Sequence, residues 1–572
     1  MAITAADRPW LGHYPPGMPA AIDTSQYRSL VELLETSFSQ YAGRKACSFM
    51  GCDFSYAELD HRSRELAACF QCLGLRRGER IAVMLPNIPQ YPVTVAAILR
   101  AGCVVVNVNP LYTPRELEHQ LNDSGASAIV VLENFAATLQ ACLARTGLRQ
   151  VLLCAMGDML GLFKGALVNH VVRRVRRLVP AYALPQALRF NTALACGRGV
   201  KLIRPALGPD DPALLQYTGG TTGIAKGALL LHRNLIANVL QSEAWNAPAL
   251  RRLAPGEPVC YACALPLHHI FAFTVSMMLC LRNGGQFVLI PNPRDLPATI
   301  QELERHRIHI FPAVNTLFKA LLAHPDFDRV DWSHLLVSVG GGMAVQPEVA
   351  QRWLARTGSP ICEGYGLSEA SPSVSCNPVL GGEFDGSIGM PLPGTEMMCV
   401  DEAGAEVAPG RPGEIAIRGP QLMVGYWQQP EETAQAMLPG SWFRTGDIGV
   451  MDERGYFWLV DRRKDLILVS GFKVYPSEVE AVVAELPGVL ECAAVGMPDP
   501  HSGEVVKLWV VRRDPQLDER QIRDHCRTRL TGYKRPRRIE FCAELPKNPI
   551  GKVLRRRLRD ADSCQPGAGQ AQ

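Results

Sequence analysis

The chain has 572 residues, of which 47% are hydrophobic and 20% charged, and its formal net charge at pH 7 is +4. This length gives room for several domains with buried cores, and so small a net charge excludes binding to nucleic acid through overall charge. The chain begins without an apolar signal sequence, and its longest mostly apolar run, residues 270–281, is too short to span a bilayer. These features predict a cytoplasmic protein in which residues 270–281 form a buried helix.

The first quarter of the chain alternates between helix and strand patterns. Residues 55–72 begin with Ser55 followed by Glu58, a helix-capping pattern, and then place apolar residues three and four apart. Further helices are predicted at 92–101 and 116–124, and apolar strands at 80–85, 103–108 and 128–132. Strands recur at 261–265, 286–290, 309–313 and 335–340. Helices interleaved with wholly apolar strands indicate parallel sheets covered on both faces, so we expect a large α/β domain with two sheet layers.

One basic segment, residues 162–178, stands apart from this pattern. It combines apolar residues such as Leu162, Phe163 and Leu167 with Lys164 and four arginines at 173, 174, 176 and 177. A basic amphipathic helix of this kind can lie on an anionic membrane surface. Alternatively, its apolar stripe packs on its own domain. The pattern favours neither.

Residues 217–228 read YTGGTTGIAKGA and carry the strongest chemical signal of the chain. Glycines let backbone N–H groups approach a ligand, threonine hydroxyls add donors, and Lys226 adds a positive charge. The usual P-loop spacing is absent, because Gly227 follows the lysine. The alternative is a flexible turn, but so continuous a run of glycine and hydroxyl residues predicts a loop that binds phosphate.

From about Gly389 the composition changes to short strands separated by Gly and Pro, which predicts a small β barrel or sheet. After Arg462 the pattern is α+β, with helices at 477–486 and 519–529 and strands at 491–495 and 505–511. We therefore expect an N-terminal domain at 1–460, a hinge at 461–465, a mobile C-terminal domain at 466–560 and a disordered tail at 561–572.

The eighteen cysteines are scattered, with two C-x-x-C pairs at Cys69/Cys72 and Cys260/Cys263. The adjacent His268 and His269 lack the spacing of a zinc site. Buried cysteines acting as small apolar residues are therefore the expected arrangement.

Four further stretches could carry chemistry. The segment 363–369, EGYGLSE, offers an aromatic ring that can stack on a base, then a hydroxyl and a carboxylate. The segment 442–447, WFRTGD, ends in a carboxylate suited to a sugar diol. The segment 461–465, DRRKD, is a charge cluster, and 546–552, PKNPIGK, places Lys552 at the end of a turn. Each alone could be an ordinary turn, cap or surface run, but their joint occurrence in this order argues otherwise.

With these motifs the chain resembles the adenylate-forming family of acyl-CoA synthetases, coumarate–CoA ligases, luciferases and peptide-synthetase adenylation domains, over residues 29–559. It is similar to the bacterial long-chain fatty-acid–CoA ligase branch in four stretches, namely LPLHHIFA at 265–272, WFRTGDIG at 442–449, VSGFKVYP at 469–476 and LTGYKRP at 530–536.

The resemblance implies a two-step reaction. A fatty acid carboxylate attacks the α-phosphate of ATP to form acyl-AMP and pyrophosphate, and coenzyme A then displaces AMP. Mg²⁺ is the implied metal, and catalysis is mainly positioning and charge stabilisation. A medium-chain or aryl-acid ligase remains the alternative, as does, from another class, a non-catalytic membrane-associated lipid-binding protein. Peripheral contact with the cytoplasmic face of an anionic membrane and a homodimer both stay open.

The resemblance also assigns site residues. Lys552, Thr218, Glu369 and His269 are the implied catalytic residues, and Glu369 holds Mg²⁺. Lys464 is the hinge, Gly471 and Lys473 line the coenzyme A channel, and His269 and Phe273 border the acyl pocket, with Phe273 where some long-chain enzymes carry a gating tryptophan. The implied ATP-binding residues are Thr218, Gly219, Gly220, Thr221, Thr222, Gly223, Lys226, Gly341, Gly342, Glu363, Gly364, Tyr365, Gly366, Ser368, Asp447 and Arg462.

Overall fold

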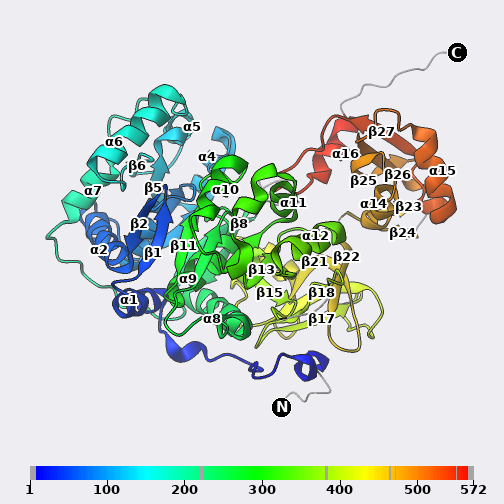
Figure 1. Cartoon of the computed structure of the whole chain (residues 1–572), viewed down its shortest axis with the longest axis horizontal. Coiled ribbons are helices and arrows are strands. Elements are labelled where there is room, and N and C mark those ends of the chain that lie inside the picture. Colours follow the sequence, from blue (N-terminus) through cyan, green and yellow to red (C-terminus); the bar gives the residue numbers. More distant parts are fainter. Residues whose placement is uncertain are drawn as a thin grey trace. The chain divides into compact units, whose positions relative to one another are not determined.

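The structure is a computed structural model that describes residues 8–218, 225–380, 384–462, 465–469, 472–500, 502–548 and 551–563 (Figure 1). The chain forms two compact units. The first comprises Met1–Glu396 and Arg418–Gln435, and the second Met397–Ile417 and Ala436–Gln572. This division reflects contacts within each unit and not motion between them. The predicted hinge at 461–465 therefore stays a prediction.

Two largely parallel sheets form the first unit. In the described part of the chain, sheet A has the strand order β16-β15-β14-β13-β12-β10-β11-β1-β2. Its strands are β1 (Lys45–Phe49), β2 (Cys52–Ser55), β10 (Cys260–Cys263), β11 (Gln286–Leu289), β12 (Ile310–Ala313), β13 (Val337–Gly340), β14 (Ile361–Gly366), β15 (Ser373–Cys376) and β16 (Met390–Pro391). The strands from β1 to β14 pair in parallel, and the outer pairs are antiparallel.

Sheet B has the order β19-β9-β8-β4-β3-β5-β6-β7 among the described residues. Its strands are β3 (Arg80–Met84), β4 (Val104–Asn107), β5 (Ala126–Leu132), β6 (Gln150–Cys154), β7 (Leu188–Arg189), β8 (Pro212–Thr218), β9 (Lys226–Leu231) and β19 (Gly425–Tyr426). The strands from β8 to β7 pair in parallel, whereas β9 runs antiparallel to both β8 and β19. Two α/β sheet layers were expected, and this prediction is confirmed.

Thirteen helices described in the first unit connect or cover these strands. They are α1 (Leu30–Gln40), α2 (Tyr56–Cys72), α3 (Gln90–Arg100), α4 (Pro114–Ser124), α5 (Ala136–Leu143), α6 (Leu162–His170), α7 (Phe190–Gly197), α8 (His232–Leu250), α9 (Leu279–Arg282), α10 (Leu296–Glu304), α11 (Asn315–Ala323), α12 (Pro347–Thr357) and α13 (Pro430–Ala436). Two π-helical segments, η4 (Val171–Val175) and η5 (Ala272–Met278), and the 3-10 turn η8 (Ser368–Ala370) also matter for function.

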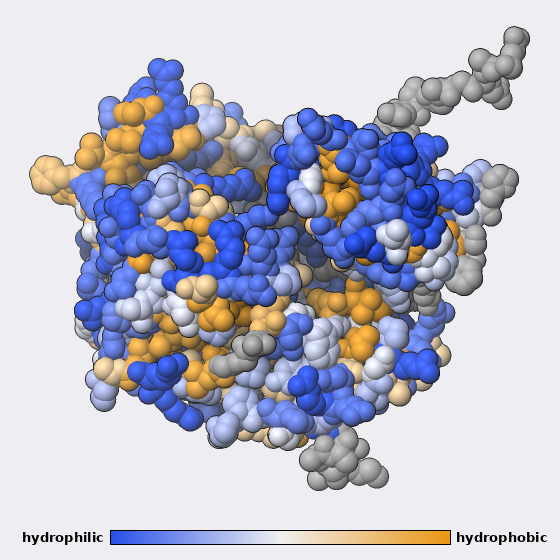
Figure 2. All heavy atoms as spheres, turned by 45° about the vertical axis from the view of Figure 1, so that its right-hand side comes forward, coloured by the Kyte–Doolittle hydropathy of each residue, from blue (hydrophilic) through white to orange (hydrophobic). Residues whose placement is uncertain are grey.

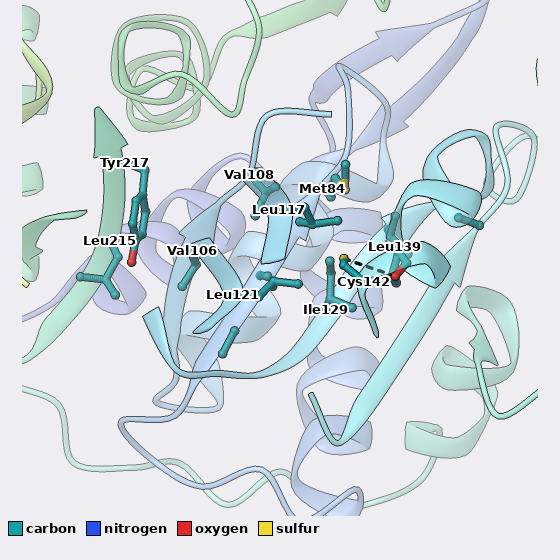
Figure 3. Packing of buried hydrophobic residues seen from close by; sticks show 14 of the residues in the cluster. Met84, Val106, Val108, Leu117, Leu121, Ile129, Leu139, Cys142, Leu215 and Tyr217 are labelled. Carbon is teal, nitrogen blue, oxygen red and sulfur yellow. Dashed lines mark hydrogen bonds between the residues drawn. The ribbon is translucent and has the colours of Figure 1, made fainter. Parts of the chain in front are cut away.

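Both faces of sheet B are buried because its strand residues are apolar on both sides. Ala82, Val106 and Ile129 share one cluster with residues of α4 and α5, including Leu117 and Leu139. Figure 3 shows Val106, Leu117, Ile129 and Leu139 of this cluster, with Leu215 and Tyr217 of β8 beside Val106. Helices α3 and α7, which pack against α2, contact strands β3, β4, β6 and β7 of the same sheet. The strand that leads into the glycine-threonine stretch is therefore held by the core of sheet B.

The second unit contains a small sheet and an α+β part. The small sheet has strands β17 (Glu396–Val400), β18 (Gly413–Arg418), β20 (Met437–Leu438), β21 (Trp442–Met451) and β22 (Phe457–Arg462). The α+β part has strands β23 (Ile467–Val469), β24 (Phe472–Val474), β25 (Val489–Asp499), β26 (Gly503–Arg512) and β27 (Arg538–Cys542), and helices α14 (Pro476–Ala484), α15 (Glu519–Arg529) and α16 (Arg555–Ser563). Both were expected from the sequence.

Two helical predictions need comment. The apolar run 270–281 is buried as expected, but it is formed by η5 and α9 rather than by one α-helix. The basic segment 162–178 is likewise divided, into α6 and η4 followed by a turn. Among the described residues, no helix combines the length and apolar character that crossing a bilayer requires.

Candidate functional site

The predicted phosphate loop connects two paired strands of the first unit. Thr218 ends β8 and Lys226 begins β9, and the two residues are opposite each other in the antiparallel register. The Thr218 hydroxyl donates to the Lys226 carbonyl at 3.4 Å. Residues 219–224, which include the predicted Gly219, Gly220, Thr221, Thr222 and Gly223, lie outside the described residues. The structure thus places the two ends of the loop next to each other, on neighbouring strands of sheet B.

Lys226 and Glu369 both interact with Tyr426, the first with its ring and the second with its hydroxyl. The Lys226 ammonium lies 5.5 Å from the centre of the Tyr426 ring and forms an ion pair with Glu432. The Tyr426 hydroxyl donates to Glu369 Oε1 at 2.8 Å. Glu369 and Ser368 lie in η8, which contacts both β8 and β9. The structure therefore brings the predicted phosphate residue and the predicted metal residue together, through a tyrosine that the sequence patterns did not single out.

The glycines predicted to border adenine lie at the ends of two neighbouring strands. Gly341 and Gly342 follow β13, and Gly364, Tyr365 and Gly366 lie in β14. A Cβ added at Gly341 would come within 2.9 Å of the Phe271 ring and 3.4 Å of the Gly364 carbonyl oxygen. Gly342 has φ +78°, a conformation that favours glycine. The close approach of Phe271 also places the predicted acyl-pocket stretch beside these glycines.

Glu363 begins the same motif and is almost fully buried. The Val345 N–H donates to its Oε1 atom at 3.2 Å. Burial raises the pKa of the Glu363 carboxyl to about 8. Near neutral pH this residue is therefore largely protonated, and it can offer a hydrogen bond donor as well as an acceptor.

We expect Glu363→Gln to stabilise the protein more at alkaline than at acidic pH. The folded protein keeps a proton on Glu363 between the ordinary pKa of 4.5 and about 8, whereas the unfolded chain releases it. The free energy of unfolding of the wild type therefore falls as pH rises through this window, and glutamine removes that loss. Thermal melts at about pH 5 and about pH 9 measure the effect. If the difference in Tm between variant and wild type is the same at both pH values, the raised pKa of Glu363 is wrong. The control is Glu348→Gln, which removes one carboxylate at an exposed position of α12.

The turn that carries His268 and His269 is fixed by buried polar side chains. Asn87 donates from Nδ2 to the Leu265 carbonyl at 2.8 Å and accepts from the Leu267 N–H at 2.8 Å. The Tyr91 hydroxyl donates to the Leu267 carbonyl at 2.8 Å. Gln216 of β8 donates to the His268 carbonyl at 3.2 Å. Our sequence analysis missed all three positioning residues, because nothing in their local spacing marks partners so far away in the chain.

Burial lowers the pKa of His269 to about 4, so its imidazole is neutral at neutral pH. Its Nδ1 atom accepts from the Phe271 N–H at 3.3 Å, which leaves the proton on Nε2. Phe273, the other predicted acyl-pocket residue, is fully buried in η5. A neutral histidine can donate one hydrogen bond to a carboxylate without a charge of its own.

In the second unit, the two predicted ribose residues are cross-strand partners. Asp447 of β21 is opposite Arg462 of β22 in the antiparallel register. Asp447 is buried, and its N–H donates to the Thr445 hydroxyl oxygen at 3.1 Å. The strand pairing therefore places next to each other two residues that are fifteen apart in sequence.

Lys552 follows a tight turn built on Asn548. The Lys552 N–H donates to Asn548 Oδ1 at 2.8 Å, and the Asn548 N–H donates to the Lys552 carbonyl at 2.8 Å. Gly551 has φ +86° within this turn. Lys473 lies in β24 opposite Leu468. The predicted hinge residue Lys464 and the predicted channel residue Gly471 lie outside the described residues.

Arg555, three residues after Lys552, connects three segments of the second unit. Its Nη2 atom donates to both carboxylate oxygens of Glu480 at 2.8 and 2.9 Å, and its Nη1 atom lies 3.7 Å from Asp465. Arg559 donates to the same Asp465 carboxylate at 3.1 Å. These ion pairs attach α16 to α14 and to the residue that ends the predicted hinge. Our sequence analysis missed them as well.

Comparisons with known proteins show the family to which the chain belongs. Residues 34–427 match the family described as AMP-binding enzyme, and residues 478–552 match the AMP-binding enzyme C-terminal domain. The chain belongs to the AMP-binding enzyme family. This AMP-binding enzyme is also 52% identical over 552 residues to a long-chain-fatty-acid–CoA ligase of Escherichia coli O157:H7. The match covers 96% of this chain and 98% of the relative. Both findings confirm the resemblance seen in the sequence.

Solved structures of two other proteins share the fold of this AMP-binding enzyme. The anthranilate CoA ligase AuaEII, in complex with anthranoyl-AMP, superposes with a TM-score of 0.81 at 26% identity, covering 95% of this chain and 99% of that one. ATP-bound MatB from Rhodopseudomonas palustris superposes with a TM-score of 0.77 at 28% identity, covering 93% and 99%. The predicted α/β fold with a smaller C-terminal part is confirmed.

Proposed function

We propose that the protein is an ATP-dependent long-chain fatty-acid–CoA ligase. The observation that carries the proposal is the 52% identity, over nearly the full chain, to an enzyme named for this activity. The residues that the chemistry requires are all present, among them Lys226, Glu369, Asp447 and Lys552. The presence of these charged and polar groups supports a catalytic protein rather than a lipid-binding protein that has lost activity.

The proposed reaction has two steps. A carboxylate oxygen of the fatty acid bonds to the α-phosphorus of ATP as the bond to pyrophosphate breaks, giving acyl-AMP. The thiol of coenzyme A then loses its proton and bonds to the acyl carbon as AMP leaves. Adenylation is needed because a free carboxylate is a poor electrophile with no good leaving group.

Each step relies on groups that position charge. Thr218, Lys226 and the loop between them contact the β- and γ-phosphates, and Gly341, Gly342 and Tyr365 border the adenine. Asp447 and Arg462 hold the ribose. His269, neutral through burial, donates to the fatty acid carboxylate.

The residues present fit Mg²⁺, which supplies positive charge to the phosphate oxygens when bound. Glu369 offers carboxylate oxygens and Thr218 a hydroxyl, and magnesium prefers oxygen donors. Within the described residues no cluster of three or more His, Cys, Asp or Glu side chains could hold a metal alone. An ion held by one carboxylate, waters and substrate phosphates is the arrangement that such a site favours.

The second step is proposed to use a different orientation of the C-terminal part. Lys464 serves as the hinge residue about which residues 466–560 turn after adenylation. The stretch around Gly471 and Lys473 then borders the coenzyme A channel, where glycine leaves room for a thin pantetheine arm.

We also propose that the enzyme acts as a peripheral protein on the cytoplasmic face of a membrane. Long-chain fatty acids partition into bilayers, so a ligase beside the membrane has ready access to its substrate.

A panel of acids tests the proposed activity. The protein is incubated with ATP, Mg²⁺, coenzyme A and either palmitate, octanoate or benzoate, and AMP and acyl-CoA are measured. We expect the highest kcat/KM with palmitate. A higher kcat/KM with octanoate or benzoate would overturn the long-chain assignment, and no acyl-CoA with any acid would overturn the ligase assignment.

A further inference from the structure

Five large apolar side chains around α6 are exposed to solvent. Leu162 is 88% exposed, Phe163 93%, Leu167 63%, Val175 66% and Leu178 56%. Figure 2 shows hydrophobic residues gathered beside hydrophilic ones at the upper left of the molecule, the side on which α6 lies in Figure 1. Scattered single apolar residues on a surface are normal, but a contiguous group of this size usually marks an interaction site.

The opposite side of α6 is held firmly against its own unit. A Cβ added at Gly165 would come within 2.4 Å of the Gly157 carbonyl oxygen, so the two backbones touch. The Asn169 side chain accepts from the Gly157 N–H at 2.7 Å, and Val172 is buried. Because this face is fixed by direct backbone contact, the helix cannot rotate to bury its apolar residues. The alternative in which the apolar stripe packs on its own domain therefore fails for these five side chains.

The basic residues of the segment divide into two groups. Arg173 forms two hydrogen bonds of 2.8 Å with the buried carboxylate of Glu133, and Lys164 donates to the Met50 carbonyl, so both help to anchor the segment. Arg174, Arg176 and Arg177 are exposed and take no part in these anchoring contacts. Within the part of the chain that the structure describes, no acidic side chain forms an ion pair with any of these three.

We propose that this α6 surface docks on an anionic lipid bilayer, a proposal that rests on the ligase function and on its peripheral location. The surface comprises Leu162, Phe163, Leu167, Val175 and Leu178 together with Arg174, Arg176 and Arg177. The apolar side chains enter the boundary between headgroups and acyl chains, and the three guanidinium groups bind lipid phosphates. Shallow insertion of an apolar face bordered by cations is the usual way in which an amphipathic helix binds a membrane.

Charge favours a bilayer over a second copy of the chain. In a two-fold dimer the same patch would meet itself, so the three arginines of each copy would approach those of the other. Like charges placed together in an interface oppose association, whereas anionic headgroups complement them.

Sedimentation with vesicles tests the proposal. The full chain is mixed with vesicles of phosphatidylglycerol and phosphatidylcholine, or of phosphatidylcholine alone, and the bound fraction is measured at low and high salt. We expect the wild type to sediment with anionic vesicles and salt to weaken binding. Reversing Arg174, Arg176 and Arg177 to glutamate should lower the partition coefficient by more than about a hundredfold, since loss of each basic residue near the surface costs about fivefold and the new carboxylates are repelled by the anionic lipids. Phe163→Asp with Leu167→Asp should also abolish sedimentation.

Matched controls separate the surface from general effects. Leu111→Asp with Ile203→Asp changes two other exposed apolar residues, and Arg251→Glu, Arg252→Glu with Arg352→Glu reverses three other exposed arginines. These variants should sediment like the wild type. Equal sedimentation by the α6 variants and wild type, or no sedimentation of wild type, would overturn the proposal.

Two further readouts separate this proposal from others. If the α6 variants convert a wild-type dimer to a monomer in size-exclusion chromatography, the face joins two copies and membrane docking is wrong. AMP formation from detergent-dispersed palmitate should be unchanged in the α6 variants, which supports a role in docking alone. The ligase proposal fails separately, by absence of acyl-CoA from a wild type that still binds vesicles.

Discussion

Lys552→Ala is expected to slow formation of acyl-AMP by about a hundred- to a thousandfold while leaving its conversion to acyl-CoA nearly unchanged. In the first step a carboxylate and a triphosphate, both negative, must approach each other. An ammonium group placed between them lowers this repulsion most as the new bond forms, so it stabilises the transition state more than the ground state. The turn around Asn548 fixes the Lys552 backbone on both its N–H and its carbonyl sides, which limits the positions that its side chain can take.

The two steps are measured separately. Exchange of pyrophosphate into ATP with palmitate reports the first step, and release of AMP from supplied palmitoyl-AMP and coenzyme A reports the second. Lys547→Ala is the matched control, because Lys547 is in the same turn but forms an ion pair with Glu491 at 2.6 Å. It should retain both steps. Equal losses in both steps for Lys552→Ala would argue that the lysine supports the fold or both reactions, and not adenylation in particular.

Local patterns predicted the elements well where a short stretch of sequence determines the structure. The Ser55 and Glu58 pattern forms the expected reciprocal cap of α2, with bonds of 2.9 and 3.2 Å. The apolar strands of sheet B were recognisable because both of its faces are covered, so almost every residue had to be apolar. For α15 the predicted bounds match those observed.

The site depends on contacts that no local pattern contains. Tyr426 reaches Glu369 from 57 positions away, and Asn87 holds the histidine turn across 178 residues. Each such side chain looks ordinary in its own segment. Motifs could therefore indicate Glu369 and His269, because glycines, hydroxyls and charges crowd around them in sequence, but the residues that orient them become visible only in the folded chain.

Segment 162–178 shows a different limit. Its sequence allowed two orientations, since an apolar stripe looks the same whether it faces the core or the solvent. The deciding contact lies between Gly157 and Gly165, whose backbones touch and thereby set which side of α6 faces outward. Neither glycine belongs to the apolar stripe, so its pattern could not resolve the choice.

Glu369→Gln is expected to lower the rate of acyl-AMP formation about a hundredfold at low Mg²⁺ and to raise the Mg²⁺ concentration needed for half-maximal rate. Glutamine keeps the size of the side chain and an oxygen that can accept from the Tyr426 hydroxyl, so the packing around η8 should survive. It removes the negative charge, and a neutral amide oxygen binds Mg²⁺ more weakly than a carboxylate does. An unchanged Tm would confirm that the variant is folded.

Calorimetric titration separates the metal from the nucleotide. Glu369→Gln should weaken binding of ATP in the presence of Mg²⁺ and have little effect in its absence, because the lost interaction runs through the ion. Glu431→Gln, at an exposed position of α13, removes a carboxylate of the same unit and should leave the Mg²⁺ requirement unchanged. Equal weakening of ATP binding with and without Mg²⁺ would instead mean that Glu369 acts on the nucleotide through Tyr426 and Lys226, whose ammonium lies 5.5 Å from that ring. The tyrosine would then be the residue that links the phosphate loop to η8, and Tyr426→Phe should reproduce the loss.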